Sequence, residues 1–343
     1  MPLHFKFFAN FAKYFEKNRM TTLSRLQNDI ADELKLLNED IAATLHSPNP
    51  LMNEVVDNYL RTKGKQIRPI LVILSAKLFG KVNPQAISAA TSVELLHNAS
   101  LIHDDVVDET KLRRNKPTIN GIWDNHIAVL VGDFFVSSSL QKALETGDIR
   151  IISAIAQLGK LLSIGEIDQI YNAQNHTLSE DAYFEIIFRK TASLFMACVE
   201  MGAYAVKANE EETAVIREFA RLLGLCFQIK DDIFDYYDDE TIGKPTGNDL
   251  REGKITLPLL HVLADKNAPA HEEMLQLSRK ELLTAEEIKI LIDYAKDNGG
   301  IDYAYETMSR LRNEAISVLD TLPEKYNTES FRSLIDFVIS RKE

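Results

Sequence analysis

Residues 101–109 read LIHDDVVDE and residues 227–236 read FQIKDDIFDY, so the chain carries two near copies of one acidic pattern. Each copy places aspartates in the spacing D-D-x-x-D inside an apolar run, which predicts a core-facing helix. On a helix, the first and last aspartate of each copy lie one turn apart on the same face. Carboxylates held this close repel one another unless cations neutralise them.

The ligand chemistry of these aspartates favours magnesium. Hard oxygen donors without His or Cys suit this ion, which keeps several waters and takes substrate phosphates as further ligands. A single D-D-x-x-D in so acidic a chain would be weak support, because a solvated helix face explains it equally well. Two copies in apolar surroundings instead predict metal ions that hold a phosphorylated substrate between two helices. The expected metal ligands are Asp104, Asp105, Asp108, Asp231, Asp232 and Asp235.

The composition predicts an all-α protein with a single domain. The 343 residues include only 14 glycines and 10 prolines, and long segments lack the alternation of strands. No linker-like run divides the chain, so one domain is expected over residues 21–343. The net charge of −12 argues against nucleic acid as a partner. Cys198 and Cys226 have apolar neighbours and are expected to be buried free thiols in a reducing cytoplasm.

Residues 1–20 form a basic, aromatic extension that precedes this domain. Apolar side chains recur in it at helical spacing, and lysines supply positive charge, as in helices that lie on a membrane surface. The alternative is a helix that packs on the protein's own body or on a dimer partner. We therefore expect a cytoplasmic protein with peripheral membrane contact as one option, and Met20 is an alternative start.

Cations that would complete the neutralisation of a diphosphate occur at several positions along the chain, some of them beside the acidic motifs. Lys65 and Arg68 lie three residues apart in KGKQIRP, so both can reach one anion. The glycine- and charge-rich stretch 238–254 suggests a loop near the site. The candidate cations and their neighbour are Lys65, Arg68, His97, Arg113, Arg114, Lys190, Thr191, Lys244 and Lys254.

Seven segments, in this order, resemble the trans-type polyprenyl diphosphate synthases of the isoprenyl diphosphate synthase family. They are GKQIRP, ELLHNASLIHDDVVDETKLRRNKPT, VLVGDFF, GEIDQ, KTASLF, GLCFQIKDDIFDY and GKPTGNDLREGKITLPL. The resemblance extends over nearly everything after Thr21. Its one departure is Lys63, where the family often has a second glycine, and this change leaves Lys65 and Arg68 intact.

The resemblance implies a bundle of long helices around a deep central cavity, usually in a homodimer. It implies about three Mg²⁺ ions on the six aspartates, and the condensation of an allylic diphosphate with isopentenyl diphosphate by ionisation, attack and proton loss. The allylic diphosphate would be bound by Arg113, Lys190, Lys244 and Lys254, and that of isopentenyl diphosphate by Lys65, Arg68, His97 and Arg114. Thr191 and Gln228 would lie beside the reacting carbons.

The residues just before the first motif predict a long product. A helix rises about 5.4 Å per turn, close to the length of one extended isoprene unit. Short-chain family members tend to close the tunnel with an aromatic residue where this chain has Ala99 and Ser100. Six or more isoprene units are therefore expected, as in quinone side chains, with Phe134 or Phe135 as a deeper floor or as ordinary core.

Four alternatives remain open at this point. The nearest is a short-chain farnesyl or geranylgeranyl diphosphate synthase, and the next is a catalytic subunit that needs a separate partner. A class I terpene cyclase is disfavoured by the second D-D-x-x-D and by the GKQIRP site. A non-catalytic subunit is disfavoured because no expected aspartate or cation is missing.

Overall fold

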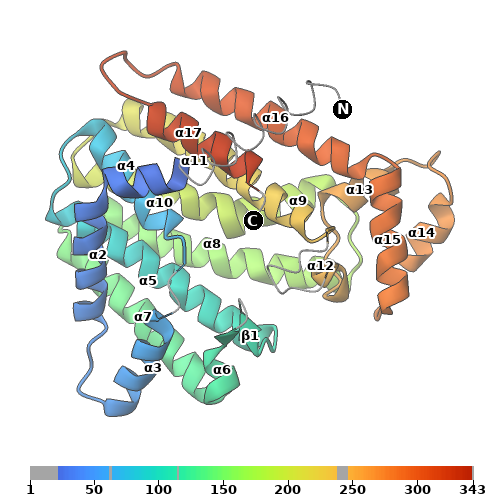
Figure 1. The fold of residues 1–343 in the computed structure, drawn as a ribbon, viewed down its shortest axis with the longest axis horizontal. Coiled ribbons are helices and arrows are strands. Elements are labelled where there is room, and N and C mark those ends of the chain that lie inside the picture. Colours follow the sequence, from blue (N-terminus) through green and yellow to red (C-terminus); the bar gives the residue numbers. More distant parts are fainter. Residues whose placement is uncertain (1–21, 62–63, 114–115, 238–245, 342–343) are drawn as a thin grey trace, which may run out of the picture.

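The fold is a stack of long helices in a computed structural model that describes residues 22–61, 64–113, 116–237 and 246–341. Figure 1 shows the longest helices running side by side, with shorter ones at the two ends. The long central helices are α4 (Ile67–Phe79), α5 (Pro84–Val107), α7 (Asn125–Glu145), α8 (Ile149–Gln174), α10 (Ser193–Ala205), α11 (Glu210–Phe234) and α16 (Gly300–Leu319). The all-α prediction is confirmed.

Shorter elements cover the ends and one side of this bundle. The helices are α2 (Ala31–Thr44), α3 (Pro50–Leu60), α6 (Ile119–Ile122), α9 (Glu180–Ile187), the π-helix η1 (Phe188–Ala192), α12 (Asn248–Arg251), α13 (Leu257–Ala264), α14 (His271–Leu277), α15 (Ala285–Asp297) and α17 (Glu329–Ser340). Two short antiparallel strands, β1 (Leu112–Arg113) and β2 (Lys116–Pro117), follow the first acidic motif.

The core forms because α4 and α10 are apolar on nearly every face. Residues 69–76 of α4 are all buried, which marks a helix surrounded by others. Glycine permits the closest approaches: a Cβ on Gly202 of α10 would lie 2.2 Å from the backbone oxygen of Val72. Cys198 and Cys226 are buried free thiols, as predicted.

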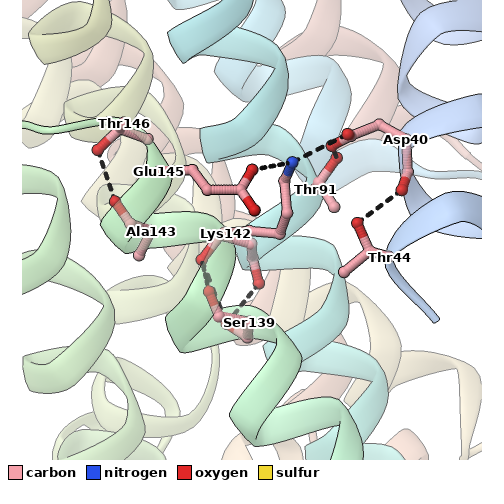
Figure 2. A network of polar contacts seen from close by, with 9 residues as sticks. Asp40, Thr44, Thr91, Ser139, Lys142, Ala143, Glu145 and Thr146 are labelled. Carbon is pink, nitrogen blue, oxygen red and sulfur yellow. Dashed lines mark hydrogen bonds and ion pairs between the residues drawn. The ribbon is translucent and has the colours of Figure 1, made fainter. Parts of the chain in front are cut away.

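A polar network fixes the end of α5 that lies away from the acidic motif (Figure 2). The Lys142 ammonium of α7 is buried and donates to Asp40 of α2 at 2.9 Å and to Glu145. The Thr91 hydroxyl of α5 donates to the other Asp40 oxygen at 2.6 Å. Asp40 therefore ties α2 to both α5 and α7, about 20 Å along α5 from Asp104.

Within the described ranges, α7 is the one helix that is long and apolar enough to cross a membrane by length and composition. It packs against α5 along its length, and 44% of its most apolar window is buried. A core helix of a soluble protein meets the same criterion, so this is weak support for a membrane span.

Candidate active site

Both acidic motifs lie at the carboxyl ends of long helices. Asp104 and Asp105 occupy the last turn of α5, and Asp108 is its C-cap. Asp231 and Asp232 occupy the last turn of α11, which Asp235 caps. A helix carboxyl end carries partial negative charge, so added carboxylates are unfavourable there. The two helices thus concentrate negative charge that only nearby cations can offset.

The middle aspartate of the first motif is held by an arginine. Asp105 is 6% exposed, and its Oδ1 accepts a hydrogen bond from Arg113 Nε at 2.9 Å. Arg113 Nη2 forms an ion pair with the same oxygen at 2.9 Å. Arg113 comes from β1, so the short hairpin after α5 returns this cation to the motif. Burial raises the pKa of Asp105, and the Arg113 charge opposes that rise.

The outer aspartates of the first motif face two lysines from distant segments. Burial, together with the charges of Glu166 and Asp108, raises the pKa of Asp104 to about 6, and Lys190 opposes this rise. Burial also raises the pKa of Asp108, and the charge of Lys254 opposes it. The fold therefore brings Lys190 and Lys254 to the first motif, as the resemblance implied for one shared diphosphate site.

Lys190 projects from an irregular turn. It lies in the π-helix η1, and single π-turns inside helices are frequent at functional sites. Its ammonium donates to Gln169 Oε1 at 2.9 Å and pairs with Glu166, both on α8. Gly165 permits this approach, because a Cβ there would lie 2.8 Å from Lys190 Cγ. Glu166 and Gln169 belong to the segment GEIDQ, for which the sequence predicted no individual role.

The middle aspartate of the second motif is held by neutral groups. Asp232 is buried and accepts from the Tyr183 hydroxyl at 2.6 Å and from Gln228 Nε2 at 2.8 Å. The Thr191 hydroxyl donates to Gln228 Oε1 at 2.6 Å, so Thr191 and Gln228 meet as expected. Burial raises the pKa of Asp232 to about 7. Sequence reasoning missed Tyr183, whose only signal was an aromatic residue on a short helix.

Asp249 is a further acidic residue at the site that was not predicted. Asp235 accepts from the backbone N–H groups of Asn248 and Asp249 at 3.0 Å each, and so fixes the start of α12. Burial raises the pKa of Asp249 well above its usual value, and the charges of Asp232 and Asp235 add to this rise. In the sequence, Asp249 could be recognised only as the aspartate of GNDLREGK, a segment that drew notice for its glycines and lysines.

A cavity of about 340 Å³ is lined by Asp232 and its partners Tyr183 and Gln228, together with Lys190 and Asp249. It opens between α8, α9, η1, α11 and the segment after α12. Cations and acids line the same space, so the cavity can bind an anion together with the cations that accompany it. The charged lining residues are Arg113, Lys190, Asp232, Asp249 and Lys254.

The cations expected to bind a second diphosphate lie on the neighbouring helices. Lys65 immediately precedes α4, Arg68 is in its first turn, and His97 lies on α5 two turns before Asp104. The Arg68 guanidinium lies 5.9 Å from the ring centroid of Phe227, four residues before Asp231. This contact places Arg68 beside the second motif. Arg114 and Lys244 fall outside the described residues.

The expected chain-length residues lie on α5 and α7. Ala99 is fully buried, and the partly buried Ser100 donates from its hydroxyl to the His97 carbonyl at 2.9 Å. Phe135 is fully buried against Tyr59 of α3, with ring centroids 5.6 Å apart, and Phe134 is partly buried beside it. Core packing accounts for Phe135, so its predicted role as a tunnel floor stays a prediction.

The carboxylates suit magnesium better than an ion that needs a complete protein cage. Among the residues with described placement, no group of three or more His, Cys, Asp or Glu side chains forms a ready metal cage. Magnesium keeps waters and takes phosphate oxygens, so one or two carboxylates per ion suffice. The pKa values of Asp104, Asp108 and Asp249 are raised chiefly by burial, and neighbouring acidic side chains add to each rise.

Comparison with known proteins gives a consistent set of relatives. A family model described as polyprenyl synthetase matches residues 49–295. The octaprenyl diphosphate synthase of Haemophilus influenzae is 31% identical over 330 residues, which cover 95% of this chain and 99% of that protein. Heptaprenyl diphosphate synthase component 2 of Bacillus subtilis is 34% identical over 313 residues, which cover 91% of this chain and 88% of that protein.

Solved structures with the same fold include proteins named for long and for short products. A decaprenyl diphosphate synthase from Rhodobacter capsulatus has a TM-score of 0.86 at 32% identity, with 94% of this chain and 99% of that one covered. A Caulobacter crescentus polyprenyl synthase, complexed with calcium and isoprenyl diphosphate, has a TM-score of 0.86 at 30% identity and coverage of 94% and 98%. A geranylgeranyl pyrophosphate synthase from Bacteroides thetaiotaomicron has a TM-score of 0.80 at 39% identity and coverage of 94% and 100%.

Proposed function

This chain belongs to the polyprenyl synthetase family and is a trans-prenyltransferase, and we propose that it extends an allylic diphosphate with isopentenyl diphosphate to a long all-trans product. The single observation that carries the proposal is the cavity beside the second acidic motif, which cations from three separate segments line. Arg113, Lys190 and Lys254 line it together with Asp232 of α11 and Asp249 of α12. The charges of Lys190 and Lys254 also act on Asp104 and Asp108 of the first motif. This arrangement suits a diphosphate that binds together with divalent cations.

The outer aspartates are the residues that would hold the ions. Asp104, Asp108 and Asp231 are partly exposed, whereas Asp105 and Asp232 already bind Arg113, Tyr183 or Gln228. We assign the middle pair to positioning, with about three Mg²⁺ ions shared among the outer carboxylates and the substrate. What magnesium supplies when bound is neutralisation of the charge that develops on the departing diphosphate.

The chain's own cations act on the same leaving group. Lys190, Arg113 and Lys254 hold the allylic diphosphate as its C–O bond breaks and the electron pair leaves with the phosphate oxygen. The double bond of isopentenyl diphosphate, held by Lys65, Arg68 and His97, then attacks the allylic cation. A proton passes to the released diphosphate, and the product is one isoprene unit longer. Thr191 and Gln228, joined by their hydrogen bond, lie beside the cavity in which this occurs.

Product length is tested by incubating the purified chain with magnesium, farnesyl diphosphate and radiolabelled isopentenyl diphosphate, followed by chain-length separation. We expect one long product, in keeping with the octaprenyl and decaprenyl synthases among its relatives. The geranylgeranyl synthase at 39% identity makes a short product the specific alternative. A product of four or fewer isoprene units would overturn the interpretation of Ala99 and Ser100 and leave the chemistry intact.

The tunnel itself is tested at the same residues. Ala99→Phe should shorten the product, because a ring one turn before Asp104 would block the extending chain. Ala99 is fully buried, so overpacking will also cost about 1–3 kcal/mol of stability, and the Tm must be measured alongside. Ser100→Phe, at a partly exposed position, is the better-tolerated companion. An unchanged product distribution in two folded variants would show that the chain extends elsewhere.

We further propose a homodimer formed through α7 and α8. Both helices carry large apolar side chains on their exposed faces, including Leu130 and Leu144 at 60% and 61% exposure and Ile167 at 66%. Apolar surface of this extent on neighbouring helices is typical of a protein interface. Bacillus subtilis heptaprenyl diphosphate synthase component 2, by its name, is one part of an assembly, so a second protein is the alternative occupant. Gel filtration of the active chain alone separates these cases.

The proposed membrane contact concerns residues 1–20, which lie outside the described residues. Liposome co-sedimentation of the full chain against a version that starts at Met20 tests it. Equal binding of the two proteins would remove the membrane hypothesis and the case for peripheral localisation.

A further inference from the structure

Arg341 is an unpredicted cation at the second acidic motif. It directly follows α17, where the backbone becomes extended (φ −61°, ψ 146°). Its Nη2 donates to Asp231 Oδ1 at 2.6 Å and to the Phe227 carbonyl at 2.9 Å. The Arg341 side chain is 8% exposed, whereas that of Asp231 is 39% exposed. The guanidinium is therefore buried against a carboxylate that remains open to solvent.

The remaining hydrogen-bonding capacity of the Arg341 guanidinium is only partly used. Its central carbon lies 4.1 Å from the Phe227 ring centroid and 5.3 Å from that of Phe234, both cation–π contacts. Its Nε atom is buried and has no hydrogen-bond partner. A buried donor without a partner is unfavourable, and release of the side chain to water would satisfy it. The contact with Asp231 is thus held by charge and can be exchanged for another cation.

The helix that delivers Arg341 is firmly anchored. Phe331, Leu334, Ile335 and Val338 of α17 are buried, and the helix packs beside α11 (Figure 1). Departure of Arg341 therefore requires only that the residues after Ser340 move, while α17 stays in place. The exchange needs no rearrangement of the bundle.

We propose that Arg341 occupies the place of a divalent cation on Asp231 in the metal-free enzyme, so that its docking competes with metal loading of the second motif. This inference rests on the proposed function, in which Asp231 holds an ion. A guanidinium and a divalent cation at one carboxylate repel each other, so binding of either weakens the other. The first motif differs, because its arginine, Arg113, binds the middle aspartate and leaves Asp104 accessible.

Mn²⁺ binding to the full chain without substrates tests the competition. Free Mn²⁺ is followed by electron paramagnetic resonance in titrations of wild type, Arg341→Ala and Arg332→Ala. Arg332 is the matched control, because it lies on the same helix and pairs with Asp320, which belongs to neither motif. We expect Arg341→Ala to bind Mn²⁺ about five-fold or more tightly than wild type, with Arg332→Ala unchanged. Equal or weaker binding in folded Arg341→Ala would overturn the proposal.

Two further measurements keep the outcome interpretable. Asp231→Asn should lose a Mn²⁺ site whether or not Arg341 competes for it, so retention of every site would contradict the proposed function itself. In wild type, modification of Arg341 by phenylglyoxal, mapped by peptide mass spectrometry, should rise as Mn²⁺ is added, with Arg332 as the internal reference. Constant Arg341 reactivity across the titration would overturn the competition, even if Arg341→Ala fails to fold.

Discussion

The two acidic motifs are nearly identical in sequence, and the fold gives them opposite surroundings. The first motif faces cations: Arg113 binds Asp105, and the charges of Lys190 and Lys254 act on Asp104 and Asp108. In the second motif, neutral groups hold the middle aspartate, and Asp235 is occupied with backbone N–H groups. Arg341, from the far end of the chain, pairs with its Asp231.

This difference teaches that the D-D-x-x-D spacing does not give each aspartate the same task. In both copies the middle carboxylate is buried and bound by the protein, which leaves Asp104, Asp108 and Asp231 as the carboxylates for ions. The first motif is arranged to meet a diphosphate together with its metals. The second is arranged around a rigid polar chain, Thr191–Gln228–Asp232–Tyr183, that anchors one side of the cavity.

The largest effect is expected from removing an outer aspartate of either motif. Asp104→Ala or Asp231→Ala should lower kcat about a thousand-fold or more, because the charge on the departing diphosphate is no longer neutralised. Circular dichroism and thermal melts should show the fold retained, since neither side chain is fully buried. Near-normal turnover in either folded variant would refute the metal assignment for that motif.

The middle aspartates provide the sharper comparison. Asp105→Asn and Asp232→Asn should each lower kcat by about ten- to a hundred-fold, the usual range for residues that position a metal ligand. Asp105→Asn should be the more harmful, because it removes the charge that pairs with Arg113, whereas the partners of Asp232 are neutral. The reverse order in steady-state kinetics at saturating magnesium would contradict the assigned difference in surroundings.

Stability should depend on pH through both motifs. The pKa is raised from 3.8 to about 6 for Asp104 and to about 7 for Asp232, so the folded state binds more protons than the unfolded chain in that range. This contribution to stability is complete below about pH 4 and is lost as the pH rises through about 6 and 7. The Tm of metal-free protein should therefore fall over this interval.

Millimolar magnesium should reduce that fall, because the ion binds the charged carboxylates. Asp104→Asn, which cannot titrate, should flatten the lower-pH part of the profile. Thermal melts with chelator and with magnesium provide the measurement. A Tm of the metal-free protein that rises from about pH 5 to about pH 7 would show that other groups dominate.

The smallest effect is expected at Tyr183. Tyr183→Phe removes one hydrogen bond to Asp232 and leaves that from Gln228, so kcat should fall only several-fold. The ring remains, and the fold should be kept. In the first motif the Asp105 carboxylate is bound by Arg113, so the matched variant there is Arg113→Lys. Lysine retains the charge but loses the planar guanidinium fork. Arg113→Lys should therefore lower kcat more than Tyr183→Phe does.

Much of the site could be predicted because the chemistry is local in sequence. The paired aspartates are recognisable from their spacing. Segments with family signatures contain Lys190, Thr191, Gln228 and Lys254. The structure brings Thr191 to Gln228 and both lysines to the first motif, as expected. Glu166, Tyr183, Asp249 and Arg341 were missed, because each is a single polar or aromatic residue on an amphipathic helix or in a loop.

By itself, the sequence determined the helical class, the two carboxylate clusters and the type of ligand they can hold. Those properties follow from periodicity and from side-chain chemistry, which are local. Only the tertiary structure decided that Arg113 pairs with Asp105, that Tyr183 holds Asp232 and that Arg341 reaches Asp231. Burial and the approach of distant helices set which charges meet and how far each pKa moves, and neither quantity is encoded in the spacing of a motif.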